Sequence, residues 1–207
     1  MAVEELLAGY HRFKRDIADD LPELERLAIE GQTPTTLWIG CSDSRVVPEL
    51  ITDASPGDLF VLRNVANIVP PHGHDDTVGA VIEYAVLHLQ VAQIVLSGHT
   101  ECGGIKALAG QLDVEVEPHL AQWIELARPA LERATPEALA EPSDEDVLLA
   151  RIRANVLLQR EHLMTYPCVR TRVADGLLVV FACVYDIRSG DVEVFNVTLG
   201  EWVLLPD

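Results

Sequence analysis

The sequence predicts an α/β fold with a mostly parallel central sheet flanked by helices. Three short apolar runs, at residues 35–40, 58–64 and 92–98, have the composition of buried strands, and helical patterns separate them. Buried strands that alternate with helices are typical of parallel sheets, which are covered on both faces. Ligands of such sheets bind beyond the carboxyl ends of the strands, so functional side chains are expected where these runs end.

Residues 1–30 predict an N-terminal helical arm ahead of the first strand. The apolar residues of 3–30 follow the spacing of an amphipathic helix: Leu6, Leu7, Tyr10, Phe13 and Ile17. Because this segment precedes the first strand, it must pack somewhere other than between strands. One option is that the arm lies on a partner subunit.

Residues 76–90 predict a helix between two of the strands. Its apolar residues lie on one face: Val78, Ile82, Ala85 and Leu89. Residues 118–142 are helical in pattern but interrupted by prolines. A long helix over 143–166 follows, with Ser143 or Asp144 as its cap and Pro167 as its stop.

The C-terminal region predicts an antiparallel hairpin that closes the sheet. Two strand-like runs, 176–187 and 191–199, flank the turn sequence "RSGD". We find no linker or internal repeat, and 207 residues suit one domain, so residues 1–207 are expected to form a single unit.

Composition excludes several classes of function. The net charge of −18 argues against nucleic acid as a partner, because nucleic-acid binding depends on Lys and Arg. No apolar run of about 18 residues is present, so no membrane span is expected. The N-terminus does not resemble a secretory signal, which favours a cytoplasmic protein whose cysteines are unpaired thiols or metal ligands. No phosphate-binding loop motif appears.

Two of the predicted strands end in residues that ligate metals. Cys41 follows the first strand in "LWIGCSDSRVVPEL", and His99 and Cys102 follow the third in "IVLSGHTECGGI". Neighbouring parallel strands end at the same edge of a sheet, so these three side chains are expected to converge on one ion. Two thiolates and an imidazole select zinc over calcium or magnesium, and three ligands leave one tetrahedral position open for catalysis.

The spacing by itself leaves other interpretations open. A cysteine after a strand is often a small buried residue, and a fourth ligand would make the site structural. Four residues are available for that role: His72, His74, Cys168 and Cys183. Asp43 and Arg45, taken alone, fit an ordinary surface salt bridge.

The motif "CSDSR", followed by "RNVAN" and "GHTECGG", resembles the β-class carbonic anhydrases. The pairing of C-x-D-x-R with H-x-x-C-G-G is highly specific for that family. The resemblance covers most of the chain, from "LLAGYHRFK" near the N-terminus to "VYDIRSGDVEVF" near the C-terminus. One departure is "VVFACVYDI", where Phe181, Ala182 and Cys183 stand in place of the family's His, Gly and Trp.

The resemblance implies a zinc lyase that hydrates CO2 reversibly to bicarbonate and a proton. One Zn²⁺ per chain is held by Cys41, His99 and Cys102, and zinc-bound hydroxide attacks CO2. Asp43 and Arg45 correspond to the family's dyad, in which the arginine holds the aspartate and the aspartate orients the zinc-bound species. In some members the aspartate instead binds zinc as a fourth ligand at lower pH and closes the site.

The resemblance also implies two pockets and an assembly. The CO2 pocket near a dimer interface corresponds to Gln32, Phe60 and Tyr84, and the Gly103 amide would contact bicarbonate. A bicarbonate-binding regulatory pocket, which would inhibit the enzyme, corresponds to Trp38, Arg63 and Tyr185. The assembly expected is a homodimer or homotetramer.

Plainer alternatives stand beside these roles. Phe60, Tyr84, Trp38 and Tyr185 fit core positions, and Arg63 fits an ion pair with an acid. At the level of function, the alternatives are a hydrolase of the same fold acting on CS2 or COS, or a non-catalytic protein that binds zinc or bicarbonate.

Overall fold

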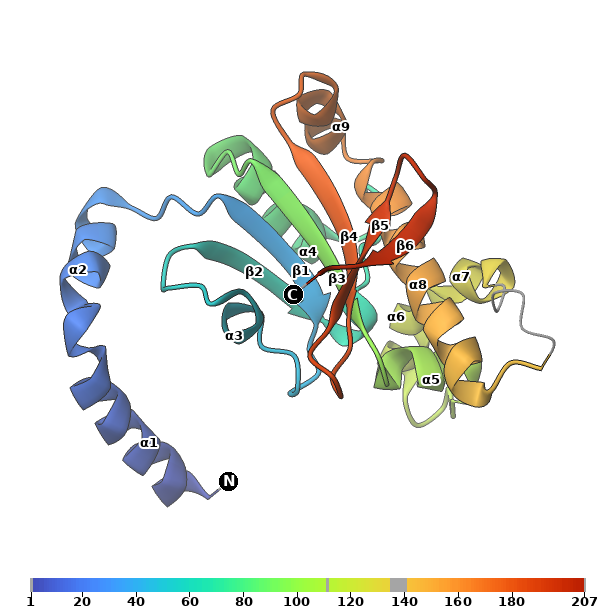
Figure 1. Ribbon diagram of the computed structural model, residues 1–207, viewed down its shortest axis with the longest axis horizontal. Coiled ribbons are helices and arrows are strands. Elements are labelled where there is room, and N and C mark those ends of the chain that lie inside the picture. The colour runs from blue at the N-terminus through green and yellow to red at the C-terminus, as the bar shows by residue number, and fades with distance from the viewer. Residues whose placement is uncertain (1, 111, 135–140, 207) are drawn as a thin grey trace.

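A computed structural model describes residues 2–110, 112–134 and 141–206. Six strands form one sheet in the order β2-β1-β3-β4-β5-β6 (Figure 1). The strands are β1 (Thr36–Cys41), β2 (Leu59–Asn64), β3 (Gln93–His99), β4 (Val179–Tyr185), β5 (Val192–Asn196) and β6 (Glu201–Leu204). The first four are parallel and the last two antiparallel, which confirms the predicted fold class.

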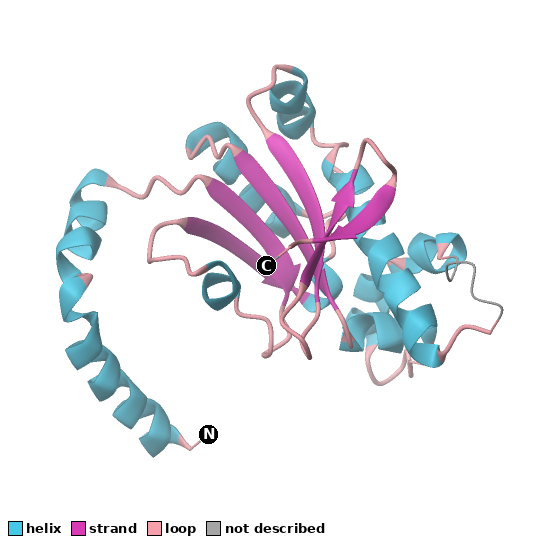
Figure 2. Ribbon diagram, in the orientation of Figure 1, coloured by secondary structure: helices cyan, strands magenta, loops and turns pink. Residues whose placement is uncertain are grey.

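Helices surround the sheet (Figure 2). They are α1 (Val3–Asp16), α2 (Leu21–Glu30), α3 (Pro48–Thr52), α4 (Asp76–Glu83), α5 (Gly103–Ala109), α6 (Pro118–Glu125), α7 (Arg128–Arg133), α8 (Asp144–Leu163) and α9 (Pro167–Ala174). A π-helical segment, Tyr84–His88, continues α4, so the predicted helix over 76–90 is present. Among the described residues, no helix is both long and apolar enough to span a membrane.

The main core lies against one face of the sheet. Leu37 and Ile39 of β1 and Ile94 and Leu96 of β3 are fully buried there. Helix α8 packs close to the same face at Gly98, where a Cβ atom would lie 2.6 Å from a methyl group of Val156. Because Gly98 has no side chain, α8 can pack closely against the end of β3, next to His99.

The predicted N-terminal helix over 3–30 is two helices instead of one. A 3₁₀ turn at Ile17–Asp19 separates α1 from α2, and Pro22 lies in the first turn of α2. Proline has no N–H to donate to the preceding turn, so it begins a new helix more readily than it continues an old one. The two helices form a bent arm that stands apart from the sheet (Figure 1).

Two details of the C-terminal half also differ from expectation. Helix α8 is capped by Ser143 as predicted, but it ends at Leu163, and Pro167 begins α9 instead of stopping α8. The predicted hairpin is present as β4 and β5, and it is followed by a strand that the sequence did not predict, β6. The backbone reverses at Gly200, whose φ of 72° suits glycine, and this turn pairs β6 with β5.

Candidate metal centre

Three potential metal ligands meet at the carboxyl edge of the sheet. Cys41 is the last residue of β1, His99 is the last residue of β3, and Cys102 immediately precedes α5. One ligand atom from each lies within 4.8 Å of the other two, and all three residues are buried. The structure thus brings together the three side chains that the spacing placed on neighbouring strand ends.

The imidazole of His99 is oriented for a ligand. Its Nδ1 lies 2.8 Å from the carbonyl oxygen of Thr100, which fixes the ring. Its Nε2 is buried and has no hydrogen-bond partner among the described residues. A buried nitrogen without a partner is costly, so this atom suits a metal ion, and the carbonyl contact at the other nitrogen is typical of metal-bound histidine.

The two thiols are electrostatically coupled. The Cys102 thiol beside Cys41 is the main cause that lowers the pKa of Cys41 to about 4, and His99 and the backbone N–H groups of Asp43 and Ala66 add to the effect. The adjacent Cys41 sulfur, and then burial, raise the pKa of Cys102. The two sulfurs thus favour a thiolate at Cys41. A cation that prefers thiolate ligands would displace thiol protons on binding, and this donor set fits zinc.

Asp43 lies beside this group and is held by Arg45. Arg45 Nε donates to Asp43 Oδ1 at 2.9 Å, and Nη2 donates to Oδ2 at 2.7 Å. These hydrogen bonds hold the pKa of Asp43 well below its usual range, so it is ionised near neutral pH. Oδ2 of Asp43 also lies 3.8 Å from Nε2 of His99, which places the carboxylate next to the candidate metal position.

Arg63 of β2 supports the same loop from the neighbouring strand. Its Nε donates to the carbonyl oxygen of Cys41 at 2.9 Å, and its Nη2 donates to that of Asp43 at 2.6 Å. Among the described residues, its hydrogen bonds therefore go to backbone oxygens and not to the acid that the plainer interpretation expected.

Trp38, Arg63 and Tyr185 project from one face of the sheet. Gly40 pairs with Arg63, the register continues through β3 to β4, and alternate residues of a strand share a face. The Trp38 indole covers Gly40, where a Cβ atom would lie 2.6 Å from the indole Nε1. This Nε1 is buried and has no hydrogen-bond partner among the described residues.

The residues expected around CO2 are only partly brought together. The rings of Phe60 and Tyr84 pack with their centroids 5.7 Å apart, whereas Gln32 is exposed on the connection between α2 and β1. Gly103 begins α5 beside Cys102, and a Cβ atom there would have open space around it.

Within the described part of the chain, the alternative fourth ligands lie outside the Cys-His-Cys group. His72 and His74 are exposed in the loop before α4, Cys168 is on α9, and Cys183 is buried within β4. Burial raises the pKa of Cys183 to about 11, so this thiol stays protonated. These positions favour an open site over one closed by a further histidine or cysteine.

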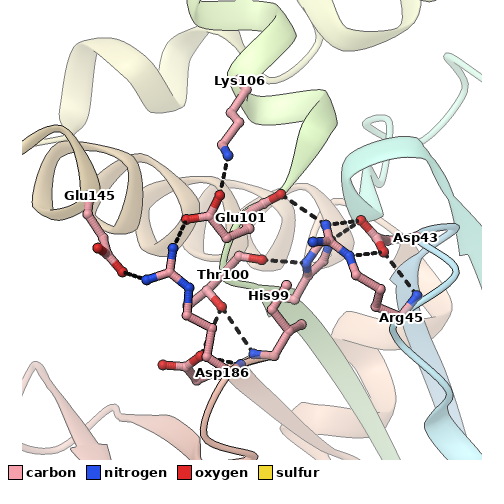
Figure 3. A network of polar contacts seen from close by, with 10 residues as sticks. Asp43, Arg45, His99, Thr100, Glu101, Lys106, Glu145 and Asp186 are labelled. Carbon is pink, nitrogen blue, oxygen red and sulfur yellow. Dashed lines mark hydrogen bonds and ion pairs between the residues drawn. The ribbon is translucent and has the colours of Figure 1, made fainter.

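No sequence pattern predicted the polar network around Glu101. Glu101 lies between His99 and Cys102, and its carboxylate contacts Lys106 and Arg188 (Figure 3). An acid between two ligand positions was visible in the sequence. Its partner Arg188, in the β4–β5 turn, could not be assigned from spacing.

This fold and site define a class: an α/β protein with a buried Cys-His-Cys centre at the carboxyl edge of a parallel sheet. Residues 36–192 match the family model described as carbonic anhydrase. A carbonic anhydrase of Pseudomonas aeruginosa is 38% identical over 206 residues, which cover 99% of this chain and 93% of that protein.

Solved structures agree with the sequence comparison. The β-carbonic anhydrase CcaA has a TM-score of 0.87 and 33% identity, with 99% of this chain and 92% of that chain covered. A tetrameric β-carbonic anhydrase of Sordaria macrospora has a TM-score of 0.82 and 33% identity, with 97% and 98% covered. The chain belongs to the β-carbonic anhydrase family, and it is accordingly an enzyme of the lyase class, a carbonate dehydratase.

Proposed function

We propose that this chain hydrates CO2 reversibly to bicarbonate and a proton, with one zinc ion per chain held by Cys41, His99 and Cys102. The observation that carries the proposal is the buried group of three ligand atoms within 4.8 Å of one another. When bound there, zinc supplies a Lewis acid that makes hydroxide available near neutral pH. Two thiolates partly neutralise the charge of the ion, so the surrounding residues must assist.

Asp43 and Arg45 supply this assistance. Asp43 is ionised and close to His99 Nε2, so its carboxylate can accept a hydrogen bond from the reacting water and orient it. Arg45 keeps the carboxylate ionised and directed toward the site through two hydrogen bonds. Release of Asp43 from Arg45 would let it become a fourth ligand and close the site at lower pH.

The residues around the substrate have distinct tasks. Phe60 and Tyr84 form an aromatic wall, which suits a small linear molecule without charge, and Gln32 completes the pocket when it is covered by a partner subunit. The Gly103 amide, at the start of α5, is available to bicarbonate.

We also propose that bicarbonate inhibits the enzyme by binding near Trp38, Arg63 and Tyr185. The buried Nε1 of Trp38 lacks a hydrogen-bond partner among the described residues, and bicarbonate oxygens are acceptors. Arg63 contacts the backbone of both Cys41 and Asp43, so an anion that draws Arg63 away would disturb the loop that carries Asp43.

The chain would act in the cytoplasm as a single domain, residues 1–207, assembled as a homodimer or homotetramer. The apolar residues of α1 are more than half exposed: Leu6, Leu7, Tyr10 and Phe13. An exposed apolar stripe on an extended arm is a typical protein contact surface, and a second copy of this chain is its proposed partner.

The test is stopped-flow CO2 hydration by zinc-quantified protein from about pH 6.5 to about pH 9, a range that brackets the acidity of water at zinc sites. Fast turnover at every pH would support an open site with Asp43 held by Arg45. Fast turnover only at the alkaline end would support the closed form. No turnover with one zinc bound per chain would contradict CO2 hydration and direct attention to CS2, COS or a non-catalytic role.

A further inference from the structure

Glu101 has a backbone conformation that its side chain does not favour. It lies between His99 and Cys102 with a φ of 61°, in the left-handed region that is unfavourable for residues with a Cβ atom. Such a conformation persists where surrounding contacts hold it. The contacts made by Glu101 therefore identify what holds the loop.

Two cations hold the carboxylate of Glu101. Oε2 pairs with the Lys106 ammonium group on α5, and Oε1 lies 3.0 Å from Nη2 of Arg188. The Glu101 side chain is only 22% exposed, although that of Arg188 is 60% exposed. Arg188 is itself anchored, since its Nη1 lies 2.6 Å from Oε1 of Glu145 at the start of α8.

The β4–β5 turn also forms hydrogen bonds with Thr100 of the same loop. Asp186 Oδ1 accepts hydrogen bonds from Thr100 Oγ1 at 3.2 Å and from the backbone N–H of Arg188 at 2.8 Å. Thr100 Oγ1 also accepts from the backbone N–H of Ile187 at 3.1 Å. Two consecutive residues of the loop between His99 and Cys102, Thr100 and Glu101, therefore bind the β4–β5 turn.

The backbone carbonyl of Glu101 contacts the Asp43–Arg45 pair. Its carbonyl oxygen accepts a hydrogen bond of 3.3 Å from Nη2 of Arg45, and the same nitrogen donates to Asp43 Oδ2 (Figure 3). One guanidinium nitrogen therefore joins Asp43 to the loop that carries two of the metal ligands. The Arg45 side chain is 50% exposed, and an ion pair this exposed is weak unless further contacts fix it.

We propose that Glu101 is a positioning residue for the Asp43–Arg45 pair. Its tethered carboxylate holds the left-handed peptide, and the carbonyl of that peptide keeps the Arg45 guanidinium on Asp43. As far as activity is concerned, this inference rests on the proposed function. The competing explanation is that the tether only stabilises the metal-binding loop, in which case its loss would release zinc without acting through Arg45.

The experiment compares Glu101→Gln with Arg188→Gln, which removes one tether from the exposed turn and leaves Glu101 in place. Glu161→Gln, which breaks the exposed pair with Arg133, is the matched control. Zinc content, melting temperature and CO2 hydration are measured for each variant, alone and combined with Arg45→Ala. We expect Glu101→Gln to lower kcat/KM about tenfold with zinc retained, and to have no further effect in the Arg45→Ala background.

A second readout does not depend on activity. Phenylglyoxal modification of Arg45, followed by mass spectrometry with Arg26 as internal reference, reports how firmly the guanidinium is held, since the ion pairs of Arg26 with Glu23 and Glu30 are unchanged in every variant. We expect both tether variants to accelerate modification of Arg45 by about threefold or more, the factor for losing one weak exposed contact. The control variant should leave the rate at Arg45 unchanged.

Several results would overturn the inference. Unchanged modification of Arg45 in both tether variants would do so, as would losses in kcat/KM that add to those of Arg45→Ala. If Glu101→Gln loses zinc, Arg188→Gln decides, and zinc loss there too would establish the competing explanation. If the wild-type protein does not hydrate CO2, the proposed function fails, and the modification rates still decide the role of Glu101.

Discussion

Asp43 Oδ2 lies 3.8 Å from Nε2 of His99 while it accepts a hydrogen bond from Arg45. The carboxylate therefore stands next to the candidate metal position without belonging to the Cys-His-Cys group. Because Arg45 also holds the other oxygen, the carboxylate is ionised and fixed in direction. This relationship makes Asp43 the residue whose replacement should separate metal binding from turnover.

Asp43→Asn should retain zinc and lose about 10²-fold or more in kcat, the range for removal of a group that handles a proton in the reaction. The amide keeps the shape of the side chain but neither the charge nor both acceptor oxygens. Zinc per chain and stopped-flow kcat check this outcome. Full activity of the variant would show that the dyad is not needed.

Cys41→Ala should lose zinc and, with it, stability. A zinc ion that binds the folded state and not the unfolded state adds about 4 kcal/mol to the apparent free energy of unfolding when free zinc exceeds the Kd about a thousandfold. Zinc analysis and urea unfolding, with and without chelator, check the prediction. Chelator should destabilise the wild-type protein and leave the variant unaffected; an equal effect on both would contradict the assignment.

Trp38→Phe should weaken bicarbonate inhibition by about tenfold, roughly the effect of one lost hydrogen bond in a buried site. The variant keeps an aromatic ring over Gly40 but removes the indole N–H. The measurement is the hydration rate as a function of added bicarbonate. Unchanged inhibition by bicarbonate would count against the regulatory pocket. Ile39→Val, on the same strand, is the control for altered packing.

Phe13→Glu should dissociate the proposed oligomer, because it places a charge on the exposed apolar face of α1. We expect the dissociation constant to rise about tenfold or more, measured by sedimentation velocity across protein concentrations. Ala8→Glu adds the same charge to an exposed position on the opposite side of α1 and is the control. If both variants remain as associated as the wild type, the arm is not the contact surface.

His162→Gln should reduce the loss of stability in mild acid. Burial lowers the pKa of His162 below its ordinary value of 6.5, so the unfolded chain takes up this proton first as the pH falls. The folded state therefore loses stability from about pH 6.5 downward, until the folded protein is protonated too. The facing groups are Glu161, Arg133, His74 and the Val69 carbonyl.

Urea unfolding at several pH values, at saturating zinc, checks this prediction by the difference between variant and wild type. That difference should change below about pH 6.5 and be constant above it. A parallel pH dependence of His162→Gln and wild type would contradict the assignment.

Hydrophobic patterning along the chain was enough to predict five of the six strands and the strand ends where functional side chains lie. Apolar runs of strand length ended just before Cys41 and His99, and neighbouring parallel strands place such ends at one edge of the sheet. This local information was sufficient for the fold class, which follows from the apolar runs, and for three candidate metal ligands, which follow those runs in the sequence.

Contacts between distant segments became visible in the folded chain alone. Arg188 meets Glu101, and Arg63 donates hydrogen bonds to the backbone of Cys41 and Asp43. Each depends on how packed elements bring residues together, and no sequence period encodes that. The bend in the N-terminal arm is a mixed case. Pro22 marks a helix boundary in the sequence, but the direction of the bend is visible only in the folded chain.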